Sequence, residues 1–187
     1  MLQTLLSQWQ PFLAVFVLLL FLMWESVAPF FPRRKRLRHA TRNLTIAVLN
    51  AIVLAFVFAS LTVLVADASQ RHQWGLLRWL GLSGVALNVV AFGAFDMWMY
   101  WWHRLNHLVP FLWRFHRMHH SDPEMDVTTA TRFHLGEITL SSLLRLLLIP
   151  LLGIPIEVLI LFDVVQLPII SFHHANISLP DRVDKAL

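Results

Sequence analysis

Histidines at helical spacing dominate the chemistry available to this chain. It contains ten histidines, and eight of them follow residue 100. His103 and His107 are four residues apart, while His116, His119 and His120 follow an i, i+3, i+4 pattern. Each group would therefore share one face of a helix. Neutral imidazole is the commonest metal-ligand side chain, so the spacing predicts a metal site built from two helices.

Further ligands follow these two groups along the chain. His134 precedes Glu137 by three residues, which predicts a helical pair, and His174, or alternatively His173, arrives near the end. This is more than one ion can use, so two closely spaced ions are expected. Histidine and carboxylate without thiolate suit iron, zinc, manganese or copper, and the chain has no cysteine. Packed core histidines and a proton relay are the alternatives, but neither requires such tight spacing.

Other side chains among the histidines have supporting or interfacial roles. Asp96, Tyr100 and His103 follow i, i+4, i+7 spacing, so Asp96 would accept a proton from a ligand imidazole; a solvated acid is the alternative. Nearby arginines would meet lipid headgroups or pair with acidic residues. These are Arg104, Arg114, Arg117 and Arg132, with Glu124, Asp126 and Glu137 as the acids. The aromatic residues between Trp98 and Phe115 are typical of an interface belt.

The elements that must position these residues are membrane helices. Of the 187 residues, 57% are hydrophobic and 14% are charged, and the mean hydropathy is +0.62. This composition excludes a disordered chain, a coiled coil and most soluble enzymes. Residues 9–31, 44–66 and 76–101 each meet the requirement for about 20 apolar residues per span. Glu25 falls near the end of the first span, where the interface would solvate it.

Two shorter apolar stretches follow. Residues 138–152 are interrupted by Arg145, and Pro150, Gly153 and Pro155 are then expected to break the helix. Residues 157–172 contain Asp163 and Gln166, with a kink expected at Pro168. Neither stretch alone is a comfortable span, so the pattern predicts a helical hairpin, either two short crossings or a re-entrant pair.

The expected fold is an all-α membrane bundle of about four to five hydrophobic helices with a histidine-rich cap. No sheet is expected, because lipid tolerates only helices or closed barrels. The chain divides into an N-terminal transmembrane region, residues 1–95, and a histidine region, residues 96–187. Residues 118–131 are the most polar stretch and are expected to form a surface loop.

A run of basic residues sets the expected orientation. Between the first two spans lie Arg33, Arg34, Lys35, Arg36, Arg38 and Arg42. In so apolar a chain this run indicates a cytoplasmic membrane flank rather than a nucleic-acid footprint. The third span and the hairpin would then place every histidine except His72 on the cytoplasmic side.

Three segments together resemble a known family. They are Asp96–His107, Leu112–Ser121 and Thr131–Glu137, with His174-Ala175-Asn176 after them. The chain from about residue 96 to 180 resembles the fatty acid hydroxylase/sterol desaturase superfamily, which are integral-membrane non-haem di-iron oxygenases. The resemblance implies two iron ions, with zinc as a substituted metal. The implied ligands are His103, His107, His116, His119, His120, His134 and His174; Asp96, Tyr100, Glu137, His173 and Asn176 are supporting or alternative ligands.

The resemblance implies oxidation of a lipid C–H bond by dioxygen, either hydroxylation or desaturation. The substrate would enter from the membrane, and electrons would come from a partner protein, because the sequence has no flavin or nicotinamide motif. The superfamily's final His-x-x-His-His segment does not follow His174. We therefore expect a fragment that binds metal more weakly than its parent and does not hydroxylate lipid. The alternatives are a membrane zinc hydrolase, with Glu137 or Glu124 as base, and a histidine-rich metal transporter or sensor.

Overall fold

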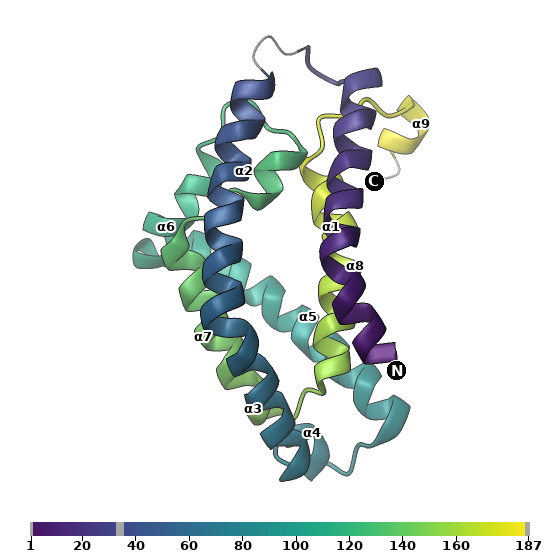
Figure 1. Cartoon of the computed structure of the whole chain (residues 1–187), viewed down its shortest axis with the longest axis vertical. Helices are drawn as coiled ribbons and strands as arrows, with labels where there is room; N and C mark the ends of the chain where they lie inside the picture. Colours follow the sequence, from purple (N-terminus) through teal and green to yellow (C-terminus); the bar gives the residue numbers. More distant parts are fainter. Residues whose placement is uncertain (1, 33–35, 186–187) are drawn as a thin grey trace.

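Helices make up nearly all of the structure, a computed structural model that describes residues 2–32 and 36–185 (Figure 1). The only β pairing within these ranges is an isolated bridge between Pro29 and Ile177, which confirms the all-α prediction. Arg33, Arg34 and Lys35, part of the basic run that is expected on the cytoplasmic side, lie outside the described residues. The elements in order are α1 (Leu2–Val27), α2 (Arg36–Val53), the π-helical turn η1 (Leu54–Ala59), α3 (Ser60–Arg71), α4 (Leu76–Trp79), α5 (Gly84–Leu108), α6 (Pro110–His120), the 3-10 helix η2 (Val127–Thr131), α7 (Leu135–Leu152), α8 (Ile156–His174) and α9 (Asp181–Asp184).

The long helices form two columns, with α5 crossing obliquely behind them (Figure 1). One column is the continuous run α2–η1–α3, whose α3 end packs on α7; the other is α1 packed on α8. Apolar side chains of α3, α4, α5, α7 and α8 form the larger core, in which Phe95, Ile149 and Leu159 are almost completely buried. A smaller core between α1, η2 and the end of α8 includes Phe21 and Val127. The larger core thus holds α5, and the smaller core holds the end of α8 near His174.

Four helical segments of the described chain are long and apolar enough to cross a membrane. They are Trp9–Val27, Arg36–Trp79, Leu135–Leu152 and Ile156–His174. Many of their large apolar side chains point outward: Phe12 is 68% exposed and Phe56 is 84% exposed. Such exposure is costly in water but favourable against lipid tails, so the chain has the surface of a membrane protein.

The predicted third span, residues 76–101, has the wrong boundaries. The short helix α4 ends at Trp79, and α5 begins only at Gly84 and then continues to Leu108. Between them Gly81 adopts a positive φ of 80° and Ser83 is extended, so the helix cannot pass through. The segment α5 is not among the four membrane-length apolar segments described above.

The hairpin prediction is also corrected. Both α7 and α8 are long and apolar enough to span a membrane, so neither is too short. Pro150 does not end α7, which continues to Leu152 and stops at Gly153, where φ is 78° and the amide N–H donates to the Ile149 carbonyl. Arg145 donates two hydrogen bonds to the Asp163 carboxylate, at 3.0 and 2.9 Å. The two interrupting charges therefore compensate each other across the hairpin.

A polar stripe on α2 faces the segment that joins α6 to α7. Its members His39, Asn43 and Asn50 are all buried. Asn50 donates to the carbonyl of Phe133, and Asn43 donates to the hydroxyl of Thr128. Residues 118–131 were expected to be a surface loop, but their second half is buried, because η2 is held between α1, α2 and α8.

Candidate metal centre

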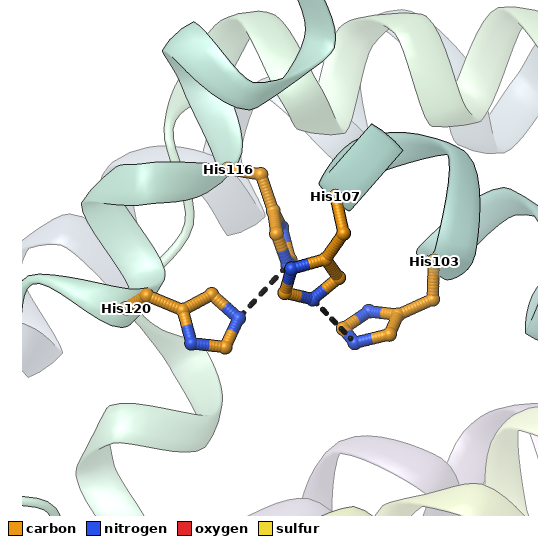
Figure 2. A group of neighbouring side chains, drawn as sticks. All are labelled: His103, His107, His116 and His120. Carbon is orange, nitrogen blue, oxygen red and sulfur yellow. Dashed lines mark hydrogen bonds between the residues drawn. The ribbon is translucent and has the colours of Figure 1, made fainter. Parts of the chain in front are cut away.

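Four imidazoles converge where α5 meets α6. Only Val109, in an extended conformation, separates the end of α5 from Pro110 at the start of α6, so the second helix folds back beside the first. His103 and His107 come from α5, and His116 and His120 come from α6 (Figure 2). One nitrogen from each ring can be chosen so that all four lie within 4.8 Å of one another. We call this group the four-histidine cluster.

The spacing of the nitrogens in the four-histidine cluster suits a metal ion. Nε2 of His103 and Nε2 of His107 are 3.2 Å apart, and Nε2 of His116 and Nε2 of His120 are 3.1 Å apart (Figure 2). With metal–nitrogen bonds of about 2.1 Å, adjacent ligands around one ion are separated by roughly 3.0–3.4 Å. Each of these two pairs thus has the spacing of adjacent ligands around one ion, and the donor set fits the metals predicted for it.

The surroundings keep these rings in the form that binds metal. Burial and the neighbouring rings of His116, His107 and His120 lower the pKa of His103 from its usual 6.5 to about 4. The same two causes lower the pKa of His107 and of His120. Neutral imidazole is the ligand form, so none of these three rings needs to lose a proton at neutral pH before it binds an ion.

A buried carboxylate orients one of the four rings. His116 is completely buried, and its Nδ1–H donates to Oε1 of Glu137 at 2.8 Å. Glu137 lies in the first turn of α7, whose start is capped by His134. The other carboxylate oxygen, Oε2, is buried and has no partner in the described chain. The hydrogen bond fixes the tautomer that presents Nε2 to the cluster, which is how proteins support a metal-binding histidine.

A second pair of imidazoles lies beside the four-histidine cluster. Nε2 of His119 is 2.9 Å from Nε2 of His174, and the rings of His119 and His116 are 5.6 Å apart. The Nδ1–H of His174 donates to the carbonyl of Ile170, which leaves its Nε2 to face His119. Burial and the nearby His174 ring lower the pKa of His119 to about 3, and its ring stacks on Phe133. The His119–His174 pair thus has the arrangement expected of two ligands of the predicted second ion.

Other predicted ligands are not brought to either group. His134 is exposed, and its Nδ1 accepts from the amide of Gly136, so it caps α7 rather than pairing with Glu137. His173 is exposed, and its ring lies against that of Phe172. Their roles as ligands remain predictions.

The predicted supporting residues have other contacts. Asp96 accepts a hydrogen bond from Gln166 at 2.9 Å and meets no histidine, while Tyr100 is 58% exposed. Asn176 shapes the chain after His174, because its side-chain amide donates to the carbonyl of Phe31. Of the supporting candidates, Glu137 alone touches a ligand imidazole in the described structure.

Sequence reasoning missed the contacts of His39. Its Nδ1 lies 3.0 Å from Asp126 and its Nε2 lies 2.7 Å from Asp122, so both ring nitrogens are within hydrogen-bond distance of carboxylates. Burial would raise the pKa of Asp122, but hydrogen bonds from His39, Thr129 and Asn43 lower it to about 2. Because Asp122 follows His120 closely, this network connects α2 to the end of α6. The signal was the spacing of the polar stripe on α2, four and then seven residues.

Glu25 was expected to be solvated at the membrane interface, and this is wrong. It is 3% exposed, and its Oε1 accepts from the amides of Val127 at 2.7 Å and Asn176 at 2.8 Å. Arg36 donates to its other oxygen at 3.1 Å. The carboxylate can be buried because it accepts hydrogen bonds from two buried backbone amides. These hydrogen bonds also join α1 to η2 and to the chain after His174.

Comparison with known proteins identifies one family. The family model described as fatty acid hydroxylase matches residues 88–186, which includes both histidine groups and most of α5. No curated protein and no solved structure matches the chain. The matched segment begins on α5 and covers α6, α7 and α8, the elements that bring the imidazoles together.

Proposed function

Because this chain belongs to the fatty acid hydroxylase family, we propose that its histidines bind two iron ions that oxidise a lipid C–H bond with dioxygen, by hydroxylation or desaturation. Membership supports an oxidoreductase of the lipid hydroxylase or desaturase type, and the candidate spans support a membrane location. The observation that carries the proposal is the convergence of four imidazoles from two helices, with one of them held by a buried carboxylate.

The chain's own residues would have separate tasks at this site. His103, His107, His116 and His120 would hold one ion, and His119 with His174 would supply ligands to the second. Glu137 would keep His116 in the tautomer that binds, through the hydrogen bond from Nδ1. Iron, once bound, supplies the binding and reduction of dioxygen. His134 is proposed as a further ligand only if the start of α7 shifts.

The apolar surroundings of the site suggest its substrate, and the need for electrons suggests a partner protein. The lipid chain would approach from the bilayer, since the surrounding helices expose apolar side chains. An electron-donor protein is required because reduction of dioxygen consumes electrons, and the sequence carries no flavin or nicotinamide motif of its own. We also propose that the histidine end lies on the cytoplasmic side, on the strength of the adjacent basic run.

The test is metal-dependent lipid oxidation by the protein as its gene encodes it. The protein in lipid nanodiscs would be loaded anaerobically with Fe(II), then given dioxygen, a chemical reductant and a mixture of lipids, with products analysed by mass spectrometry. We expect oxygen-dependent formation of hydroxylated or desaturated chains, lost in His103→Ala and retained in His72→Ala at the opposite end. Lipid hydrolysis with zinc and without reductant would instead support a hydrolase, and metal flux without turnover would support a transporter.

A further inference from the structure

A recess near the start of α2 contains charged side chains that have no charged partner within the described residues. It has a volume of about 450 Å³ and is lined by Arg38, His39, Arg42, Pro123 and Glu124. The first three come from α2, and the last two come from the segment that follows α6. A cavity of this size is within the usual range for small-molecule sites, roughly 300–1,000 Å³.

The charges of the recess fall into two classes. Arg38 and Arg42 are one helical turn apart, so their guanidinium groups share a face of α2. Glu124 supplies a carboxylate from the segment that follows α6. Within the described part of the chain, none of these three side chains makes a hydrogen bond or an ion pair, although all line the same recess.

His39, which also lines the recess, already has hydrogen-bond partners within the chain. His39 is buried and directs both ring nitrogens at Asp122 and Asp126, away from any ligand in the recess. A ligand would therefore meet two free cations, one free anion and the ring of Pro123. This combination is complementary to a molecule that carries a negative group and a positive group a short distance apart.

From this arrangement we infer that the recess binds a phosphate ester that carries a primary ammonium, the headgroup of phosphatidylethanolamine. Guanidinium groups bind phosphate oxygens through paired, charge-assisted hydrogen bonds. Glu124 would accept from the ammonium, which has three N–H donors, whereas a quaternary ammonium has none. The recess lies at the end of the candidate span Arg36–Trp79, where the phosphate layer of a bilayer is expected. This inference is independent of the metal centre and of the proposed oxidation.

The experiment measures which lipid remains with the protein. The chain would be placed in nanodiscs of equal phosphatidylethanolamine, phosphatidylcholine and phosphatidylglycerol, extracted mildly, and analysed by native mass spectrometry for bound lipid. We expect phosphatidylethanolamine to be enriched over both other lipids. Equal retention of all three, or an equal preference for phosphatidylglycerol, would overturn the assignment, because the second outcome would show that only the arginines select the ligand.

Variants separate the two halves of the site. Arg38→Gln or Arg42→Gln should lower the enrichment about tenfold, as expected for loss of a charge-assisted hydrogen bond. Glu124→Gln should move the preference from phosphatidylethanolamine to phosphatidylglycerol, since only the ammonium partner is removed. Arg71→Gln, at the other end of the bundle and 75% exposed, is the matched control and should change nothing. An unchanged preference in Glu124→Gln would contradict the proposal.

A last arm distinguishes the lipid from a soluble compound of the same chemistry. Free phosphoethanolamine at millimolar concentration should not displace the lipid, because it lacks acyl chains that remain in the bilayer. Displacement at low concentration would overturn the lipid assignment and assign the recess to a soluble phosphate ester. All three variant positions are exposed, and unchanged thermal unfolding would verify that each variant is folded.

Discussion

Nδ1 of His116 lies 2.8 Å from Oε1 of Glu137, and both side chains are buried. This contact joins α6 to α7 across 21 residues of sequence and decides which ring nitrogen is free. The free Nε2 is the atom that lies 3.1 Å from His120. The carboxylate therefore prepares the four-histidine cluster before any ion arrives.

Glu137→Gln should weaken metal binding. An amide accepts the hydrogen bond from His116 less strongly than a carboxylate does, so the tautomer is less well fixed. Loss of such a supporting carboxylate typically lowers metal affinity about 10–100-fold. Titration of the metal-free chain with Fe(II) or Zn(II) would measure it. Glu124→Gln is the control, since its side chain has no partner in the described structure, and an equal effect of both variants would refute the role of Glu137.

Replacing single histidines should separate ligands from neighbours. His103→Ala or His120→Ala should remove most binding at one ion, because each supplies a nitrogen to the four-histidine cluster. His134→Ala should keep the metal but lower the stability of α7 by about 0.5–2 kcal/mol, the usual cost of losing an N-cap. Metal content per chain and thermal unfolding would be measured together. Loss of metal in His134→Ala would show that α7 rearranges to bring this ring in.

Acid should destabilise the metal-free chain. The pKa of His103 is about 4 and that of His119 about 3 in the folded chain, against an ordinary value of 6.5. As the pH falls, these histidines are protonated in the unfolded chain before they are protonated in the folded chain. The free energy of unfolding is therefore highest above pH 6.5 and decreases as the pH falls toward 4. Thermal unfolding between pH 7.5 and 4.5 would show a decreasing Tm. His119→Asn should flatten this dependence, and a Tm that rises on acidification would contradict the burial of neutral imidazoles.

Apolar length predicted most of the bundle, and histidine spacing predicted the four-histidine cluster but not the pairing of His119 with His174. The i, i+4 and i, i+3, i+4 patterns place His103 beside His107 and His116 beside His120, because a regular helix fixes which residues share a face. The break at Gly81 was not predictable in the same way, since an isolated glycine is also common inside membrane helices. Nor could spacing show that His134 caps a helix, because a cap and a first-turn residue differ by only one or two positions.

The contacts between segments that are distant in the sequence could not be predicted from it. Glu25 looked like an interfacial acid, and only the folded chain brings the amides of Val127 and Asn176 to its oxygen. His39 stands apart from the other histidines, near a basic run, and its carboxylate partners follow more than 80 residues later. Helical periodicity describes neighbours on one element, whereas these contacts depend on how elements pack.

Arg145 and Asp163 should be strongly coupled. Their paired hydrogen bonds lie between two helices long and apolar enough to cross a membrane, where an unpaired charge is costly. Arg145→Met should destabilise the chain by up to about 3–5 kcal/mol, the cost of removing one partner of a pair shielded from water, because this part-buried pair would otherwise face lipid. Adding Asp163→Leu should restore most of the loss, because no charge then remains unpaired. Unfolding in detergent would measure the four members of this cycle, and strictly additive effects would contradict the coupling.

The most direct test of the metal centre is X-ray absorption at the iron edge, made on the Fe(II)-loaded chain and on His103→Ala/His120→Ala. We predict scattering from several imidazole rings in the parent chain, and iron content that drops by about half or more in the double variant, since the four-histidine cluster loses two of its ligands. Iron that is bound equally by both proteins, or surrounded by oxygen ligands without imidazole, would contradict the assignment of this cluster as the metal site.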